Sequence, residues 1–425
     1  MTATTAEAGR AGAESHLEPD ARPWVGLLVV YWITSFVESF GISQVFAFML
    51  PYLQQMGVPK PDIGPTIGIL SSLTFILGLP LVPLWGVWAD KYSRKVVIIR
   101  SAIVEAIVFG EIALSATPWQ MAIGLLLVGF QLGNTGVMLA ALRDVAPRPR
   151  LGVVIGLFGV SSPIGMASGP IVGSFLIDGL HLPIAAVYWA AAVLSLGVAL
   201  LLALGSREIR PEVVPTGSVR SLATRAVMGV LTDRVTMRLF AAFATLYLAR
   251  QMSQPFLSLL VERGNAGPGS MGLATAIGLV TGIGPLAGAL LAPVAGWAGD
   301  RIGFRPVLAV ALVGGATSLA VMPFAPGVLP LAAVAVAWAG CFGAVTAMVF
   351  GVLAVELPPE RRSATLNLVY LPLYVAGIIG PTLGAGVLTF GLDAVYVVSA
   401  VLLAAGALLI TVPLVRARRL SGPSV

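Results

Sequence analysis

Two charged residues stand near the centres of long apolar runs, Glu38 in an early run and Arg250 in a much later one. A charge at the centre of a membrane-spanning helix costs roughly 2.5–3.5 kcal/mol on insertion scales, so it usually has a function or a partner. Burial favours the neutral form of a carboxyl group, whereas a nearby arginine favours its charged form. We therefore interpret Glu38 as a group that binds a proton or another cation. The alternative is a permanent structural ion pair.

Polar residues accompany these charges at helical spacing. Gln254 follows Arg250 by one turn, and Gln131 and Asn134 lie three residues apart in another apolar run. Each such residue can equally serve as a helix–helix hydrogen bond. As a set they predict a substrate-binding surface, which comprises Glu38, Arg250, Gln254, Gln131, Asn134, Asn367, Tyr370 and Tyr374.

A second acid and base, Glu105 and Arg100, share one apolar run. We expect either a structural pair between them or an Arg100 side chain that extends toward the membrane surface. In either case Glu105 is the next acid to consider if Glu38 does not bind the proton.

The chain that positions these groups is strongly apolar, with 57% hydrophobic and 10% charged residues. Soluble domains carry roughly 25% charged residues, so the bilayer must solvate most of these side chains. Apolar stretches of about 20 residues bounded by charge, proline or glycine mark membrane spans. The sequence predicts an all-α membrane protein with twelve spans, at 24–53, 63–89, 96–116, 118–142, 151–178, 182–204, 238–261, 271–295, 306–325, 329–354, 363–389 and 392–415.

The spans divide into two sets of six. We expect a tail at 1–23, a first six-helix bundle at 24–204, a linker at 205–237, a second bundle at 238–415 and a tail at 416–425. With the N-terminus in the cytoplasm, 21 of the 25 Lys and Arg residues fall on the cytoplasmic side. The positive-inside rule then predicts that both tails and the linker are cytoplasmic. Membrane orientation explains the basic charge better than nucleic-acid binding does.

Short motifs return in the second half about 210 residues after their first appearance, which indicates a repeat. Gly86-Val-Trp-Ala-Asp90-Lys91 returns as Gly296-Trp-Ala-Gly-Asp300-Arg301, and Gly169-Pro170 returns as Gly380-Pro381. Parallel repeats of this kind occur in secondary transporters, with the substrate site near the membrane midplane. The two bundles are therefore predicted to be pseudo-symmetric.

At these residues the chain resembles the major facilitator superfamily, over nearly its whole length. Its loop Gly86-x-x-x-Asp90-Lys91-x-Ser93-Arg94-Lys95 matches the loop motif of the superfamily except at Ser93, where the motif has glycine. The resemblance implies the major facilitator fold and ion pairs that hold the cytoplasmic face shut. It also implies a central cavity lined by the first and seventh spans, across which Glu38 and Arg250 would face each other. The alternative is that these arginines only set the topology. The implied gating residues are Gly86, Asp90, Arg94, Asp144, Asp300, Arg301 and Glu356.

A second motif in the fifth span resembles the pattern of the antiporters of that superfamily. It consists of Gly156, Gly165, Gly169, Pro170 and Gly173, with Ser174 in place of a final glycine. Small residues at this spacing let helices pack closely, and the proline bends the helix. Generic packing is the alternative reading. One feature departs from the superfamily: Gly129 stands where some members carry a proton-coupling arginine.

Transport is the function that these features favour. The chain lacks the Gly-x-x-x-x-Gly-Lys-[Ser/Thr] loop of ATP-driven pumps and any histidine-rich or paired-carboxylate set typical of an enzyme. One cysteine and two histidines argue against a disulfide or a metal site, and we expect no cofactor. We expect a monomer in a bacterial inner membrane that exports small amphipathic molecules or drugs in exchange for protons. The alternative is proton-coupled uptake of an organic anion, which Arg250 would bind.

Overall fold

The apolar runs form helices because every backbone N–H and C=O inside a bilayer must be bonded within its own segment. The computed structural model describes residues 23–211, 214–231, 234–267, 269–356 and 371–420. Within these residues the regular secondary structure is helical throughout. The prediction of an all-α protein is confirmed.

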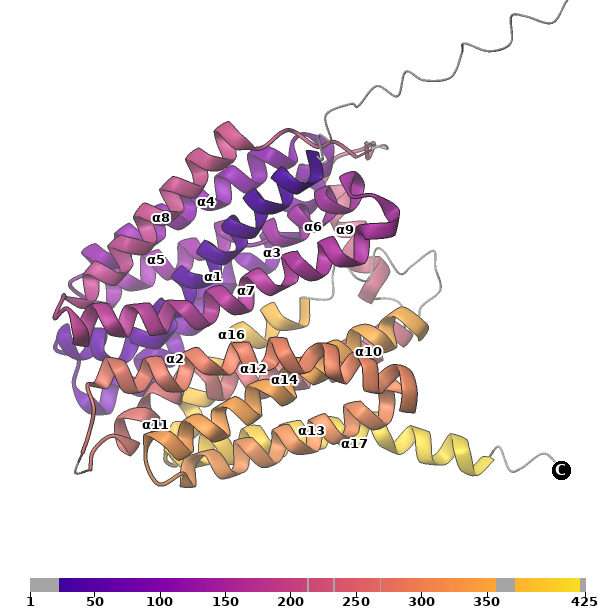
Figure 1. The fold of residues 1–425 in the computed structure, drawn as a ribbon. Coiled ribbons are helices and arrows are strands. Elements are labelled where there is room, and N and C mark those ends of the chain that lie inside the picture. Colours follow the sequence, from indigo (N-terminus) through magenta and orange to yellow (C-terminus); the bar gives the residue numbers. More distant parts are fainter. Residues whose placement is uncertain (1–22, 212–213, 232–233, 268, 357–370, 421–425) are drawn as a thin grey trace, which may run out of the picture.

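The first half of the chain forms one bundle (Figure 1). Its helices are α1 (Pro23–Gln55), α2 (Lys60–Ile76), α3 (Gly78–Lys91), α4 (Arg94–Leu114), α5 (Pro118–Gln131), α6 (Asn134–Val145), the 3₁₀ turn η1 (Arg148–Arg150), α7 (Leu151–Ser174), the π-helical turn η2 (Phe175–Gly179) and α8 (Ile184–Gly205).

The second half forms the other bundle, after the short helix α9 (Val219–Leu231) of the predicted linker. Its helices are α10 (Arg234–Ser253), the 3₁₀ turn η3 (Gln254–Phe256), α11 (Leu257–Gly264), α12 (Leu273–Ile302), α13 (Phe304–Val321), the 3₁₀ turn η4 (Met322–Phe324), α14 (Val328–Glu356), α16 (Leu371–Leu388) and α17 (Leu392–Leu420).

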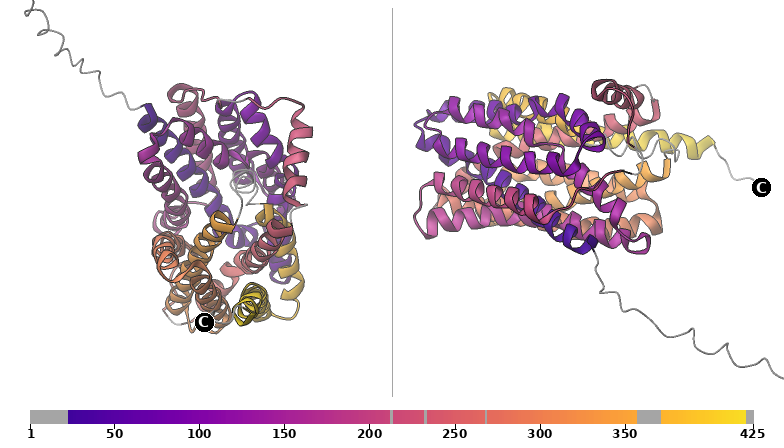
Figure 2. Two further views of the ribbon diagram at one scale, coloured as in Figure 1. Left: turned by 90° about the vertical axis from the view of Figure 1, so that its right-hand side faces the viewer. Right: turned by 90° about the horizontal axis from the view of Figure 1, so that it is seen from above.

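The two bundles lie side by side with their helices along a common direction (Figures 1 and 2). They meet chiefly where α2 packs on α16 and α7 packs on α12. Helix α9 lies at one end, against α3, where the Lys91 ammonium group donates a hydrogen bond to the Gly217 carbonyl over 2.5 Å. We call this the linker end. The opposite end, where α1 joins α2 and η2 packs against α12, is called the hairpin end.

Nine helical segments of the described chain are long and apolar enough to cross a membrane. Three more helical segments lie in the bundles. Helix α4 carries five charged residues, the α10–α11 segment is interrupted by η3, and the apolar stretch of α17 is described over a shorter length. Together they correspond to the twelve predicted spans.

Three predicted spans are interrupted rather than continuous. Pro80 has no N–H to donate to Ile76, and the second span is divided there into α2 and α3. Pro255 likewise lies in the tight turn η3, which interrupts the seventh span. The fourth span is divided at Gly133, whose φ of 98° lies in the left-handed region that glycine tolerates.

The glycine motif of the fifth span packs α7 against α1. A methyl group at Gly165 or Gly169 would overlap the carbonyl oxygens of Phe36 and Phe40, so these two glycines set how closely the helices approach. Gly173 faces the Phe48 ring, and Pro170 lies inside α7 with its carbonyl oxygen against Gly278 of α12. Gly156 faces open space. The motif therefore serves packing within the first bundle and, at its far end, contact between the bundles.

Candidate functional site

Glu38 lies near the middle of α1, with a partly exposed side chain. Its two carboxylate oxygens accept hydrogen bonds from separate amides. Asn134 donates from Nδ2 over 3.0 Å, and Gln131 donates from Nε2 over 3.4 Å. Both amide residues are 2% exposed, so the carboxylate is held by buried neutral donors.

The interruption of the fourth span brings these two amides together. Gln131 is the last residue of α5 and Asn134 is the first of α6. The backbone hydrogen bonds of the helix are interrupted between α5 and α6. The Gln131 carbonyl instead accepts a hydrogen bond from Ser101 Oγ over 2.8 Å. Sequence reasoning read 118–142 as one helix and missed this break. The available signal was Gly133 immediately before a polar residue.

Gly129, where the resemblance implied an arginine in some members, has no room for a side chain. A Cβ atom here would overlap Leu77 and the backbone nitrogen of Gly78, at the junction of α2 and α3. The kink of the second span therefore fills the space that such an arginine would need. Glu38 takes its polar contacts from Gln131 and Asn134 instead.

Arg250 does not pair with Glu38 in this conformation. No ion pair between them occurs among the described residues, and the Arg250 guanidinium carbon lies 4.2 Å from the centre of the Phe342 ring. Neighbouring Gln254 begins the turn η3 and is partly exposed. Tyr374 is buried, and its ring centre lies 6.2 Å from that of Phe75 in the other bundle.

Two further predicted members of this surface, Asn367 and Tyr370, lie outside the described residues. The side chain of the expected gating residue Glu356 does as well.

The expected pair between Arg100 and Glu105 is not formed. The Arg100 guanidinium carbon lies 3.8 Å from the centre of the Trp85 ring, and its Nη2 atom donates to Ser101 Oγ over 2.9 Å. Glu105 is 3% exposed. A cation–π contact on an indole can hold a partly desolvated arginine without an acid.

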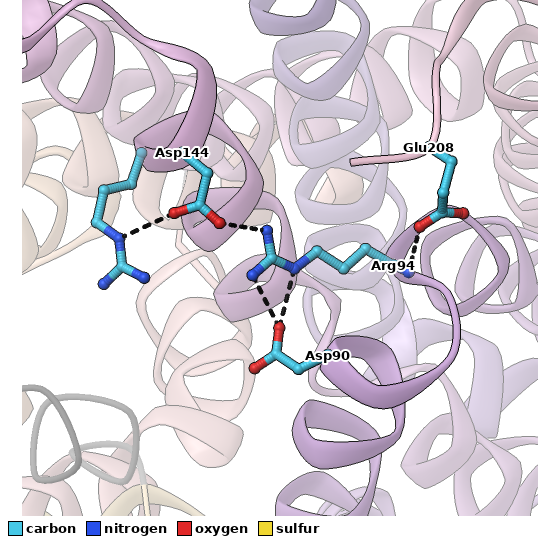
Figure 3. A network of polar contacts seen from close by, with 5 residues as sticks. Asp90, Arg94, Asp144 and Glu208 are labelled. Carbon is cyan, nitrogen blue, oxygen red and sulfur yellow. Dashed lines mark hydrogen bonds and ion pairs between the residues drawn. The ribbon is translucent and has the colours of Figure 1, made fainter. Parts of the chain in front are cut away.

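A charge cluster lies at the linker end of the first bundle (Figure 3). Arg94 is its centre, with a side chain 2% exposed that lies 2.8 Å from Asp90 and 2.7 Å from Asp144. Glu208 accepts a hydrogen bond from the backbone N–H of Arg94 over 2.9 Å and another from the Ser93 hydroxyl. Ser93 in turn accepts from Val96 N–H and so caps α4.

This cluster lies wholly within the first half of the chain. Asp90, Arg94, Asp144 and Glu208 come from α3, α4, α6 and the segment after α8 (Figure 3). Sequence reasoning found three of them and missed Glu208, because nothing in a polar linker distinguishes one acid from another. Gly86 has open space around it.

The second copy of the motif is arranged differently. Asp300 and Arg301 are both exposed, and the Arg301 guanidinium carbon lies 4.2 Å from the centre of the Trp297 ring. Among the described residues neither makes an ion pair. Within the described residues, the repeat in sequence is therefore not matched by a repeat of these contacts.

Several hydrogen bonds join the two bundles in the described part of the chain. The hydroxyl groups of Ser72 in α2 and Thr382 in α16 lie 2.8 Å apart, and two other contacts lie toward the hairpin end. Asp178 of η2 accepts from the backbone N–H and the hydroxyl of Thr275 in α12, over 2.6 and 2.7 Å. Gln54 of α1 donates to Glu262 of α11 over 2.7 Å. Sequence reasoning missed these contacts, because each joins residues from different halves.

Comparison with known proteins matches the chain to the family model described as Major Facilitator Superfamily, over residues 27–274 and 239–424. The multidrug resistance protein MdtG of Klebsiella pneumoniae (strain 342) is 28% identical over 381 residues, which cover 89% of this chain and 90% of that protein. The protein of the same name from Salmonella typhimurium is 28% identical over 380 residues, which cover 89% and 92%.

Solved structures with the same fold include a point mutant of the nucleoside transporter NupG. It has a TM-score of 0.75 and 17% identity, and the match covers 92% of this chain and 99% of that one. A bacterial homologue of the human lysosomal transporter Spinster, in an inward-facing and occupied conformation, has a TM-score of 0.73 and 15% identity, and the match covers 92% and 96%.

Proposed function

The chain belongs to the Major Facilitator Superfamily, and from this premise we propose that it is a secondary transporter that exports small amphipathic molecules or drugs in exchange for protons. Relatives that match most of its length are named multidrug resistance proteins, which supports drug-like substrates. The observation that carries the proposal is the Glu38 carboxylate, which lies at mid-span between two buried amides at a helix break.

Glu38 suits exchange because one carboxylate can bind a proton or attract a cationic substrate, but not both at full strength. Protonation removes the charge that Asn134 and Gln131 now hold through charge-assisted hydrogen bonds. Substrate and proton then bind in turn. Each of them shifts the equilibrium between the two conformations of the protein by the difference between its affinities for those conformations. The interruption at Gly133 lies beside this carboxylate. A change in the charge of Glu38 therefore acts at the break between the half-helices α5 and α6.

The conformation supports alternating access. Under the predicted orientation the hairpin end is extracellular, and there Asp178 and Thr275 hold the bundles together. At the linker end the charge cluster of Arg94 stays within one bundle. We infer that this is the state open toward the cytoplasm.

The proposal is tested by transport of ethidium in proteoliposomes with an imposed pH gradient. We expect Glu38→Gln to abolish gradient-driven ethidium transport while ethidium binding persists, because the amide mimics the protonated acid. Glu111→Gln, the same substitution at the far end of α4, is the matched control and should transport normally. Full gradient-driven transport by Glu38→Gln would show that Glu38 is not the proton site.

A second candidate function is proton-coupled uptake of an organic anion. It is favoured by Arg250, which contacts an aromatic ring and pairs with no carboxylate in the described part of the chain. Its guanidinium could therefore hold a substrate carboxylate. Reversing the pH gradient separates the two functions, since antiport and symport respond to opposite gradients.

We also propose the location and organisation of the chain. It spans the bacterial inner membrane as a monomer, with bundles at 24–204 and 238–415 and with the tails at 1–23 and 416–425 and the linker 205–237 in the cytoplasm. The basic residues of the linker end support this orientation. In a Cys341→Ser background, a cysteine at residue 215 should react with an impermeant thiol reagent only after the membrane is opened. Labelling of intact cells would contradict it.

A further inference from the structure

Glu105 is a buried acid that lacks the partner expected for it. It lies at the middle of α4 and is 3% exposed, and its Oε1 atom has no hydrogen-bond partner in the described part of the structure. Arg100 on the same helix is engaged with Trp85 and Ser101. An ionised carboxylate left in an apolar interior without a cation is strongly unfavourable.

The neighbour of Glu105 indicates which form it takes. Ser195 of α8 is fully buried and lies within hydrogen-bond reach of the Glu105 carboxyl group. Its hydroxyl donates to the Ala191 carbonyl over 2.9 Å. Ser195 carries no charge, so it can share a hydrogen bond with Glu105 but cannot compensate an ionised carboxylate.

Glu38 is linked to this part of α4 by two hydrogen bonds. Ser101, one turn before Glu105, donates to the Gln131 carbonyl, and the Gln131 amide donates to Glu38. The remaining elements packed against α4 place no charge nearby. Helices α5 and α8 contain no Asp, Glu, Lys or Arg, and the charged residues of α3 and α6 lie at the linker end, around Arg94. Two neighbouring carboxyl groups without a cation between them resist being ionised together.

We propose that Glu105 is a second proton-binding site, which holds its proton while Glu38 exchanges with substrate. Ionisation of Glu38 strengthens the hold of Glu105 on its proton, and neutralisation of Glu38 by a proton or a cationic substrate weakens it. The two groups therefore titrate as a pair rather than as independent sites. This inference rests on the proposed proton coupling at Glu38.

Infrared spectroscopy of the purified protein in lipid nanodiscs tests the protonation directly, with protons as the probe. At neutral pH the wild type should show the C=O stretch of a buried protonated carboxyl group, and Glu105→Gln should lose it. Glu111→Gln, on the same helix, should keep the band. Ser195→Ala should shift the band rather than remove it, and it tests the assignment even if Glu105→Gln folds poorly. A band unchanged in both Glu105→Gln and Ser195→Ala would overturn the proposal.

The coupling role is tested by counting protons moved per ethidium in proteoliposomes. We expect Glu105→Gln to move fewer protons per ethidium than the wild type, with ethidium binding retained. If the wild type moves protons and Glu105→Gln moves as many, Glu105 plays no part in coupling, although Glu38 still can. If the wild type moves no protons at all, the proposed function fails together with the coupling role.

Discussion

The carboxylate of Asp178 caps α12 across the boundary between the two bundles. It accepts hydrogen bonds from both the backbone N–H and the side-chain hydroxyl of Thr275, over 2.6 and 2.7 Å. An acid at a helix N-terminus satisfies an unpaired donor and interacts favourably with the helix dipole. This contact joins the bundles at the hairpin end and must break before that end can open.

Asp178→Asn should favour the state that is open at the hairpin end. The amide keeps the size of the side chain but loses the charge-assisted bonds, worth about 1 kcal/mol, which corresponds to roughly fivefold in the ratio of the two states. Distances between spin labels on the hairpin ends of α7 and α12 should report a larger open population. The exposed acid Asp62 is the control, because Asp62→Asn should leave these distances unchanged. Equal distance distributions in the two variants would show that the contact of Asp178 with Thr275 does not hold the bundles together.

Arg94→Ala should destabilise the protein far more than Arg143→Ala. Arg94 is 2% exposed and bonds two acids that water partly screens, at 41% and 26% exposure, so its loss should cost about 2 kcal/mol. Arg143 is 54% exposed and lies 3.5 Å from Asp144, a contact worth less than about 1 kcal/mol. Thermal unfolding in detergent measures both.

Asp90→Asn should insert normally yet impair transport. Normal turnover by this variant would mean that the motif only sets topology.

Gly129→Ala should be harmful although it adds only a methyl group. That methyl would overlap Leu77 and Gly78, and forcing it into a packed interior costs about 1–3 kcal/mol. Gly136→Ala in α6 is the matched control, because its Cβ would meet open space. It should be neutral or slightly stabilising. A lower midpoint of thermal unfolding is expected for Gly129→Ala only, and equal midpoints would contradict the packing argument.

Arg250→Ala should weaken binding most for anionic substrates. The guanidinium now lies over the Phe342 ring and holds no carboxylate among the described residues. Removing it therefore costs a cation–π contact in the free protein, and an ion pair as well when an anion is bound. Affinities for a matched pair of anionic and neutral ligands, measured by fluorescence quenching, give the comparison. Equal losses for both ligands would place Arg250 outside the substrate site.

Much of the architecture was predictable because bilayer physics acts on each segment by itself. A run of about 20 apolar residues must form a helix to bond its own backbone, wherever its neighbours lie. The repeat of Gly86-Val-Trp-Ala-Asp90 and the Asp144 partner of Arg94 also followed from local sequence. The breaks did not, although Pro80 and Gly133 stood in the sequence, because proline and glycine are common inside membrane helices and only some of them interrupt one.

The sequence by itself determined that Glu38 and Glu105 are charged residues in membrane helices, since a charge inside an apolar run is visible without a fold. Only the tertiary structure decided their partners. Arg100 was nearest to Glu105 in sequence, yet it lies over Trp85, and Glu38 contacts Asn134 rather than Arg250. Partner choice depends on how each helix is rotated and how closely it approaches its neighbours. Contacts between residues distant in sequence, such as Gly169 against α1 and Asp178 on α12, set that geometry, and no local pattern encodes it.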